Sequence, residues 1–296
     1  MTSAVRIGRW SFVSVGSPMV ARLGLANFLR EARGKRSSAE AAAVAGFSKA
    51  TLSRVERGES IISPGDARLL MSHYGVPEET IDSFTNLAYA AKQPGWWQRY
   101  KSALPDWLSL FVGVESAARR IRTYESELIP GILQVPGYSR ALIIKDAEAP
   151  TVEEQIQDRV NLRQRRQEKL AGDEPANLMA VINESALHRQ VGGPETHREQ
   201  MEHLLEMSAR ENLSIRVLPF TTGVHAASYG SFVLFDYSVV NKDYALAYVE
   251  YSKGALYLEA EDEISMHSRI FDSLWQDAAS QAETEGLIKD AIQRIK

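Results

Sequence analysis

Residues 46–60, GFSKATLSRVERGES, constrain the fold of this chain more than any other stretch of its sequence. Ser48 can cap a helix by accepting a hydrogen bond from an amide of the first turn, and Gly58 is a natural stop. At about 100° per residue, Leu52 and Val55 fall on one face of that helix. The opposite face carries Lys49, Ala50, Ser53, Arg54 and Arg57. The segment therefore predicts an amphipathic helix with an apolar inner face and a cationic outer face.

Four neighbouring segments predict a helical domain around this segment. Upstream, ARLGLANFLREARG places apolar residues on one stripe, and SSAEAAAVAG combines a capping-box pair, Ser37 with Glu40, with an alanine run that lets helices approach closely. Gly46 permits a tight turn between the second helix and the third. Downstream, SPGDARLLMSHYGV and PEETIDSFTNLAYAA each begin with proline and acidic residues, as helices commonly do. Residues 21–91 therefore predict five short helices.

This arrangement resembles the Xre/phage-repressor type of helix-turn-helix domain. The residues that carry the resemblance are Gly46, Ser48, Thr51, Leu52, Ser53, Glu56, Gly58 and the pair Ser63-Pro64. The resemblance implies an ion pair between Glu56 and an arginine of the first helix, for which Arg30 is the expected partner.

The same resemblance implies a DNA interface on the cationic face. The predicted interface consists of Ser38, Ser48, Lys49, Ala50, Thr51, Ser53, Arg54 and Arg57. Base reading is assigned to Lys49, Ala50, Ser53 and Arg54, and Ser38 and Arg57 are placed nearer to phosphates. An arginine or lysine that donates to guanine O6 and N7 contributes about 1–3 kcal/mol of discrimination. One domain covers one half-site, so we expect a homodimer on double-stranded DNA.

The distribution of charge agrees with this assignment, although the whole chain has a net charge of -4. Residues 1–95 carry 12 Lys/Arg and 8 Asp/Glu, a net +4, and the remainder carries 22 and 30, a net -8. Attraction to phosphates depends on charge within about a Debye length, roughly 8 Å in physiological salt. A basic helix face alone is as often a solvated surface, and it is the five-helix context that favours DNA binding.

The chain outside this domain divides at two points. Residues 1–20 fit no helical period and predict a flexible tail, with an arm that reaches the minor groove through Arg6 and Arg9 as the alternative. Residues 92–105 contain KQPGWW and predict a linker, and residues 106–296 form the second domain.

The first part of the second domain reads as helical. VGVESAARRIRTYESEL predicts one long amphipathic helix, and VPGYSRALII begins another with Pro136 in its first turn. VEEQIQDRVNLRQRRQEKLAG has helical spacing, and its Arg163, Arg165 and Arg166 either form a second DNA patch or lie on a solvated helix. The interleaved acidic residues favour the solvated helix.

From Asn177 onward the pattern changes to short β-rich runs. NLMAVINE, LSIRVLPF, GSFVLFDY and YALAYVEY predict strands of a small antiparallel sheet. ETHREQMEHLLEMSAREN predicts a helix between the first two strands, and EISMHSRIFDSLWQDAAS and ETEGLIKDAIQRI predict two helices after the last. The fold class is therefore mainly α with a small β-sheet, an α+β domain behind a five-helix domain.

The second domain also resembles a known family. The segments PGWWQRY, VESAARRIRTYE, PGILQVPGYSRAL, INESALHRQVGG and IRVLPFTTGVHAASYGSFVLFDY are similar to the domain of unknown function that follows an Xre-type helix-turn-helix in many actinobacterial regulators, including the WhiJ-like group. The similarity runs in order from about Pro94 to Ser280. It implies a transcription regulator that is often associated with a small protein encoded nearby.

The sequence lacks the common catalytic motifs. The chain has no cysteine, no G-x-S-x-G, no phosphate-binding loop and no HExxH, and His197 and His203 lack the spacing of a helical metal pair. We therefore predict no catalytic residue, no metal site and no cofactor.

The loop TTGVHAASYG is the preferred place for contact with a ligand or partner, through His225, Ser228 and Tyr229. A base and a nucleophile meeting in this loop, or a hairpin connection without any recognition role, are the alternatives.

These observations predict a cytoplasmic, DNA-binding transcriptional regulator without a membrane segment, whose second domain senses a ligand or binds a small partner protein. The competing interpretation is an antitoxin-like interaction protein that sequesters a small partner and uses DNA binding for autoregulation. A third class, an enzyme, would lose turnover on substitution of His225 while it kept DNA binding.

Overall fold

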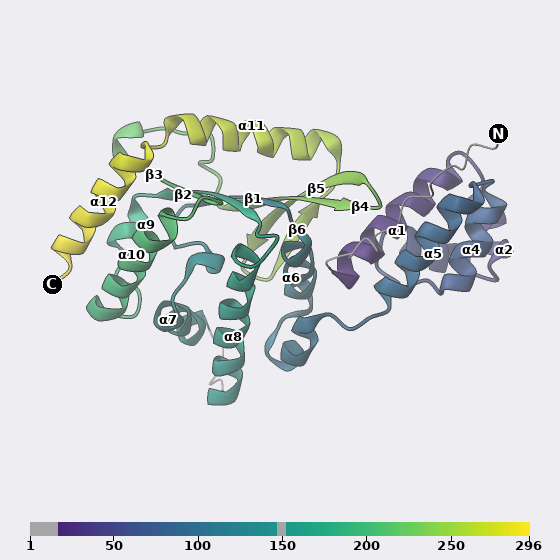
Figure 1. Cartoon of the computed structure of the whole chain (residues 1–296), viewed down its shortest axis with the longest axis horizontal. Coiled ribbons are helices and arrows are strands. Elements are labelled where there is room, and N and C mark those ends of the chain that lie inside the picture. Colours follow the sequence, from purple (N-terminus) through teal and green to yellow (C-terminus); the bar gives the residue numbers. More distant parts are fainter. Residues whose placement is uncertain (1–16, 147–151) are drawn as a thin grey trace, which may run out of the picture. The chain divides into compact units, whose positions relative to one another are not determined.

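The computed structural model describes residues 17–146 and 152–296. These residues form two compact units, the first ending at Gln93 but also including Val239–Asn241, and each unit is described by itself (Figure 1). The predicted arm with Arg6 and Arg9 lies outside the described residues.

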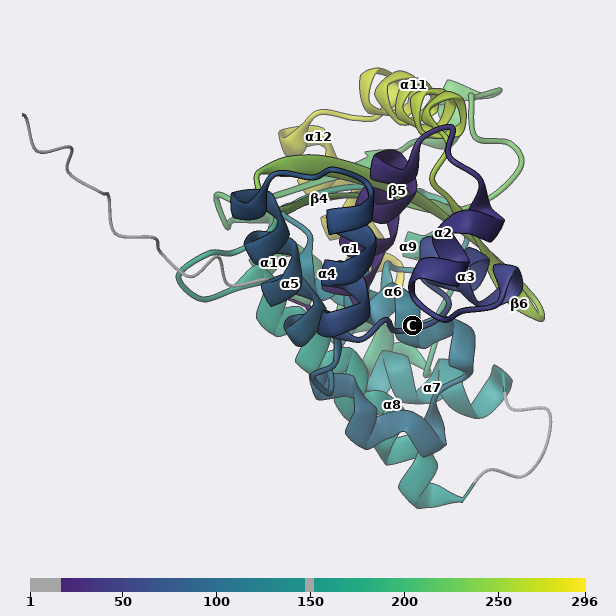
Figure 2. The ribbon, with the colours of Figure 1, turned by 90° about the vertical axis from the view of Figure 1, so that its right-hand side faces the viewer.

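The first unit contains the five predicted helices, which Figure 2 shows in purple and blue. They are α1 (Pro18–Arg33), α2 (Ser38–Val44), α3 (Lys49–Glu56), α4 (Pro64–His73) and α5 (Glu78–Ala91). Helix α1 begins at Pro18 rather than after residue 20, because the Ser17 hydroxyl accepts a hydrogen bond from the Met19 amide at 3.3 Å and proline suits the first helical position.

Local signals set the helix boundaries in this unit, with one exception. Ser48 and Ser63 each cap a helix by accepting a hydrogen bond from the amide three residues later, at 3.1 and 3.0 Å. The capping box predicted at Ser37 and Glu40 is wrong, since the Ser37 side chain makes no capping hydrogen bond. Gly46 takes a left-handed φ of 66° at the turn before α3, as a tight turn requires.

Side chains from all five helices form the core of the first unit. Helices α1 and α5 meet at Phe28 and Phe84, whose rings stack with centroids 3.7 Å apart. The fully buried large residues are Leu25, Leu29, Leu52, Leu70, Met71, Ile81 and Leu87. Burying such side chains contributes about 1.5–3 kcal/mol each, so packing rather than helix propensity holds these short helices.

The second unit is built on one mixed sheet of six strands in the order β3-β2-β1-β4-β5-β6. The strands are β1 (Arg120–Glu125), β2 (Asn177–Asn183), β3 (Leu213–Leu218), β4 (Phe232–Val239), β5 (Lys242–Tyr251) and β6 (Gly254–Leu258). Strands β1, β2 and β3 run parallel, whereas β4 is antiparallel to β1 and β6 is antiparallel to β5. The α+β class is confirmed, and the expectation of a small antiparallel sheet is wrong.

The main error lies at β1, which the sequence pattern placed inside a long helix. Helix α6 (Asp106–Ala117) ends before this strand, and β1 then pairs with β2 on one side and β4 on the other. A central strand is buried on both faces, and residues 121–124 are all buried. Such a strand shows no alternation of polar and apolar residues, so it is hard to tell from a buried helix by pattern. The short edge strand β6 was also missed.

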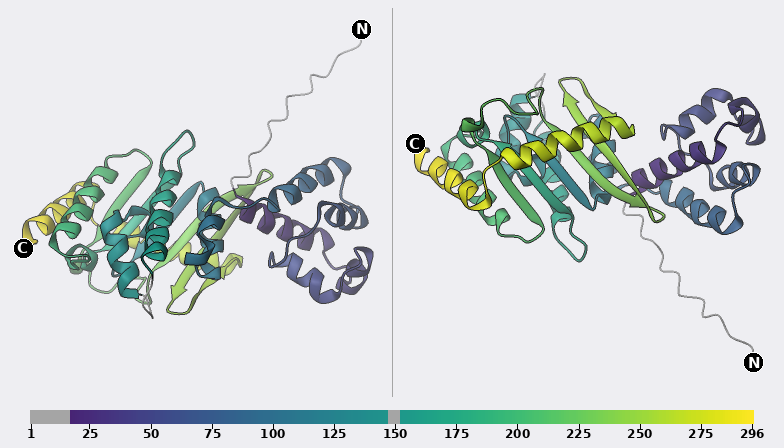
Figure 3. Two further views of the ribbon diagram at one scale, coloured as in Figure 1. Left: turned by 90° about the horizontal axis from the view of Figure 1, so that it is seen from below. Right: turned by 90° about the horizontal axis from the view of Figure 1, so that it is seen from above.

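Helices cover both faces of this sheet. The helices, with the short 3₁₀ turns η1 to η4, are η1 (Trp96–Ala103), α6, η2 (Gly131–Leu133), α7 (Pro136–Asp146), α8 (Glu153–Arg166), η3 (Gln167–Leu170), α9 (Ser185–His188), α10 (Pro194–Ser208), η4 (Phe220–Thr222), α11 (Glu261–Asp277) and α12 (Gln281–Arg294). Helix α11 lies along one face, and α6, α8 and α10 lie on the other (Figures 1 and 3). Phe271 of α11 packs against Tyr124 and Leu234, while Phe111 of α6 lies 5.2 Å from Phe235 between ring centroids.

The arginines of α8 point into this unit rather than away from it. Arg166 is buried and donates two hydrogen bonds to Glu115 of α6 at 2.6 and 2.8 Å, and Arg163 donates to the Gln134 side chain at 2.6 Å. Arg165 lies over the ring of Trp96. Neither an open DNA patch nor a fully solvated helix describes α8, because α6, η1 and Gln134 after η2 supply partners that the α8 sequence alone does not reveal.

Candidate nucleic-acid interface and ligand pocket

Helix α3 has the two faces that its sequence predicts. Leu52 and Val55 are 0% and 3% exposed, and Glu56 is also buried. The side chains of Ser48 and Thr51 form hydrogen bonds at the N-terminus of the helix. The Ser48 hydroxyl accepts a hydrogen bond from the Thr51 amide and lies 2.9 Å from the Thr51 hydroxyl. The packing of the inner face therefore fixes which side chains α3 turns outward.

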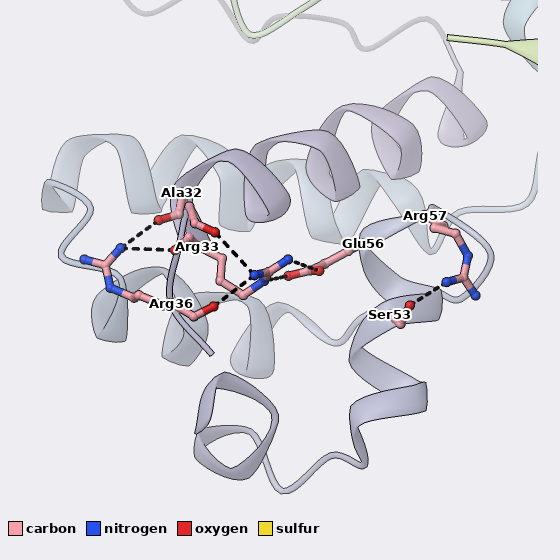
Figure 4. A network of polar contacts seen from close by, with 7 residues as sticks. Ala32, Arg33, Arg36, Ser53, Glu56 and Arg57 are labelled. Atoms are coloured by element: carbon pink, nitrogen blue, oxygen red, sulfur yellow. Dashed lines mark hydrogen bonds and ion pairs between the residues drawn. The ribbon is translucent and has the colours of Figure 1, made fainter. Parts of the chain in front are cut away.

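A partly buried ion pair connects the end of α3 to α1. Arg33 donates two hydrogen bonds to the Glu56 carboxylate, at 2.6 and 3.0 Å (Figure 4). The hydrogen bond to Glu56 raises the pKa of the Arg33 guanidinium above its ordinary value. The prediction that Arg30 pairs with Glu56 is wrong. Arg30 lies one turn earlier on α1 and donates a hydrogen bond to the Asn27 side chain at 2.7 Å. The pair therefore fixes the C-terminal end of α3 against α1 on the side away from its exposed face.

The residue that follows α3 lies close to the side chains of α1. Gly58 follows α3 with a left-handed φ of 69°, and a side chain there would meet Leu23 Cδ2 at 2.8 Å. Only glycine satisfies both the conformation and the lack of space.

The predicted DNA interface divides into exposed and half-buried side chains. Ser48, Lys49, Ala50, Arg54 and Arg57 are exposed, and Ser38, Thr51 and Ser53 are half-buried. Arg57 is held by Glu59 at 2.6 Å and also donates to the Ser53 hydroxyl (Figure 4). Among the described residues, the side chains of Lys49 and Arg54 have no hydrogen bond or ion pair. These two cations are therefore the groups of α3 with donors to spare for a base or phosphate.

The second unit contains a pocket of about 470 Å³ at the carboxyl ends of its parallel strands. Its walls come from residues directly after β1, β2 and β3 and from the loop before β4. The three residues expected to contact a ligand or partner, His225, Ser228 and Tyr229, all line it. The structure thus brings them together with side chains from three strand ends.

Polar groups converge on one wall of this pocket. The hydroxyl of Tyr124 lies 3.5 Å from His225 Nε2 and hydrogen-bonds to the side chain of Asn183. Burial raises the pKa of Tyr124, so the phenol stays protonated. The Ala227 amide donates to His225 Nδ1 at 3.3 Å, and the Ser228 hydroxyl donates to the His225 carbonyl at 2.9 Å. Nδ1 of His225 is thus the acceptor, and Nε2 faces the Tyr124 hydroxyl.

The carboxylates beside the pocket already have partners. Glu127 forms an ion pair with Arg189. Glu184 accepts from the Phe220 amide at 2.7 Å and lies 3.4 Å from His188 Nε2. Glu184 therefore joins the start of the loop after β3 to His188 of α9.

The other two histidines considered in the sequence lie in α10, where His197 is buried and His203 is half-buried. His197 Nε2 lies 2.8 Å from the Leu187 carbonyl, and burial lowers the pKa of both His197 and His203. Within the described residues there is no group of three or more His, Cys, Asp or Glu side chains arranged to hold a metal ion.

Sequence reasoning missed Tyr124, Ser126, Asn183 and Ser185 as pocket residues. The signal that could have found them is the position of polar residues directly after strands, at Ser126 and Ser185. That signal requires β1 to be recognised as a strand and β1, β2 and β3 to be recognised as parallel.

Comparison with protein families gives two matches. Residues 108–290 match the family model described as a domain of unknown function (DUF5753), and residues 25–84 match a model described as a helix-turn-helix domain. No curated protein and no solved structure matches the chain significantly. Among the helices that the structure describes, none combines the length and apolar character that crossing a membrane requires.

Proposed function

Because the chain belongs to the family of the domain of unknown function (DUF5753), which here follows a helix-turn-helix domain, we propose that it is a sequence-specific DNA-binding transcriptional regulator whose second unit senses a signal. The observation that carries this proposal is the outer face of α3. Its inner face is fixed by packing and by the pair of Arg33 with Glu56, while Lys49 and Arg54 remain exposed with unused donors.

In this proposal Arg54 and Lys49 donate to base edges in the major groove, and Ala50 contacts a thymine methyl group at most. Ser38 and Arg57 contact phosphates, for which Arg57 exchanges its ion pair with Glu59. Ser48 and Thr51 begin the helix at the groove and Ser53 lies beside Arg57.

We further propose that the DNA-binding unit is of the Xre type, that the protein is a member of the WhiJ-like actinobacterial group, and that it acts in the cytoplasm as a homodimer on a two-fold DNA site. The second unit changes the spacing of the two DNA-binding units when a ligand or small protein binds it. Such coupling requires only that the signal bind one arrangement better than the other.

The first test is binding of the purified protein to its own upstream DNA and to random DNA across a salt series. We expect tight, salt-sensitive binding to the upstream DNA, and Arg54→Ala should weaken it by about 10- to 100-fold, because one good arginine contact contributes about 1–3 kcal/mol. Arg269→Ala removes an exposed helical arginine of α11 and serves as the matched control, with unchanged binding expected.

Equal affinity of the wild-type protein for upstream and random DNA would contradict the proposal. The antitoxin-like alternative, in which the main activity is capture of a small partner protein, would then take its place.

A further inference from the structure

The pocket of the second unit lies where the topology of the sheet reverses. From β1 the chain adds β2 and then β3 on one side, and it returns on the other side of β1 with β4. In open α/β sheets, ligands bind outside the carboxyl ends of the parallel strands, which here are the ends of β1, β2 and β3. Tyr124 lies near the carboxyl end of β1 itself, and Ser126 and Ser185 follow β1 and β2.

Apart from Glu127, the polar side chains of the lining are hydroxyl, amide and imidazole groups. They are the hydroxyls of Tyr124, Ser126, Ser185, Ser228 and Tyr229, the amide of Asn183 and the imidazole of His225. The lining contains no lysine or arginine, so a phosphate or carboxylate ligand would find no cation there. Its one carboxylate, Glu127, is compensated by Arg189.

Two aromatic rings stand open at the same site. Phe220 is 59% exposed and Tyr229 is fully exposed, and both line the pocket. Phe220 is supported from behind by His188, whose ring is stacked with it at 6.2 Å between centroids. An exposed aromatic face covers the apolar CH face of a sugar ring while hydroxyl and amide groups bind its edge.

We infer that this pocket binds an uncharged, polyhydroxylated ring compound. Free saccharides and nucleosides share this chemistry. A volume of about 470 Å³ lies within the usual range for small-molecule sites, roughly 300–1,000 Å³. The role of this compound as the signal rests on the proposed function, whereas its binding can be tested without DNA.

The test measures thermal unfolding of the full chain with individual probes. The neutral probes are glucose, maltose, N-acetylglucosamine and adenosine, and the charged counterparts are glucose 6-phosphate, glucosamine and adenosine monophosphate. At about ten times its dissociation constant a ligand should raise the Tm by roughly 3 °C. We expect this shift for at least one neutral probe and a smaller one for its charged counterparts. A shift with a saccharide but not with adenosine would identify the ligand class as saccharides, and a shift with adenosine only would identify it as nucleosides.

Three variants locate the site. Tyr229→Ala removes an exposed ring, and Tyr124→Phe removes a hydroxyl while the ring stays in the core; each should reduce the shift at least threefold. Tyr251→Ala, which removes another exposed ring outside the pocket, should keep it.

The inference is overturned if no neutral probe raises the Tm, if a charged counterpart binds as well or better, or if both pocket variants keep the full shift. DNA affinity measured in the same samples separates this outcome from failure of the proposed function. Probe binding that leaves DNA affinity unchanged would contradict the regulatory coupling while the site stands. Intact DNA binding without any probe binding would remove the site while the regulator stands.

Discussion

Each unit contains an arginine and a glutamate joined by two hydrogen bonds, but the two pairs differ in burial and in structural role. In the first unit the Arg33 and Glu56 side chains are 17% and 7% exposed, and the pair fixes one end of α3. In the second unit the Arg166 and Glu115 side chains are 8% and 3% exposed, and Arg166 also lies over the ring of Phe111.

The comparison shows how the same chemistry serves a surface and a core. The first pair lies on the inner side of α3, whose outer face exposes Lys49 and Arg54. The second pair joins α6 to α8 and is buried. Removing one partner of a buried pair leaves an uncompensated charge, so the cost should follow the depth of burial.

The largest effect is expected for Glu115→Ala. Because Arg166 would stay buried without its partner, the free energy of unfolding of the second unit should fall by about 3–5 kcal/mol. Chemical denaturation followed by tryptophan fluorescence measures this loss. Glu153→Ala, which breaks the exposed pair with Arg140, is the control and should change little. Equal effects of the two substitutions would show that burial does not set the cost.

Glu56→Ala should have a smaller effect on stability and an added effect on DNA binding. Because Arg33 retains some access to water, we expect a loss of about 2–3 kcal/mol in the first unit. The end of α3 would also lose its attachment to α1, so affinity for upstream DNA should fall even at temperatures where the unit stays folded. Glu59→Ala breaks the exposed pair with Arg57 and should leave stability unchanged. A stable Glu56→Ala variant with full affinity would contradict the role given to the pair.

Glu125 makes the stability of the second unit depend on pH. Burial and the neighbouring Glu250 raise the pKa of Glu125 from 4.5 to about 7, although a hydrogen bond from Ser231 and the charge of Arg163 oppose them. The folded state therefore keeps its proton between about pH 4.5 and 7 while the unfolded state loses it. Stability from this group is full below pH 4.5 and declines as the pH rises to about 7.

Glu125→Gln should remove this decline. Relative to the wild type, the variant should gain up to roughly 2 kcal/mol between pH 4.5 and 7, a figure discounted for the partial exposure of the carboxyl group. Unfolding of both proteins at a series of pH values measures the difference, which cancels the contribution of the buried histidines. A difference that stays constant across this range would contradict the raised pKa.

The smallest effect is expected at the cap of α3. Ser48→Ala removes the hydroxyl that accepts from the Thr51 amide and should cost about 1 kcal/mol in the first unit. Ser37→Ala is a matched control, because Ser37 precedes α2 without a capping hydrogen bond and should cost less. Comparison of the Tm values of the two variants shows whether the loss of stability depends on the capping hydrogen bond or only on replacing a serine before a helix.

The sequence by itself determined the five helices of the first unit, because their caps, prolines, glycines and apolar stripes are signals within a few residues of each other. It also determined the outer face of α3 and the helices α10, α11 and α12, for the same reason. The loop with His225 was found from its composition. These features depend on local periodicity, which a chain displays without its tertiary contacts.

Only the tertiary structure decided the partners that lie far apart in the chain. Burial on both faces hid β1, and the parallel order of β1, β2 and β3 depends on pairings that no local pattern records. Arg33 rather than Arg30 meets Glu56 because the packing of α1 on α3 sets which turn faces the carboxylate. The pocket joins Tyr124, Asn183 and His225 because a sheet brings strand ends together whatever their distance in sequence.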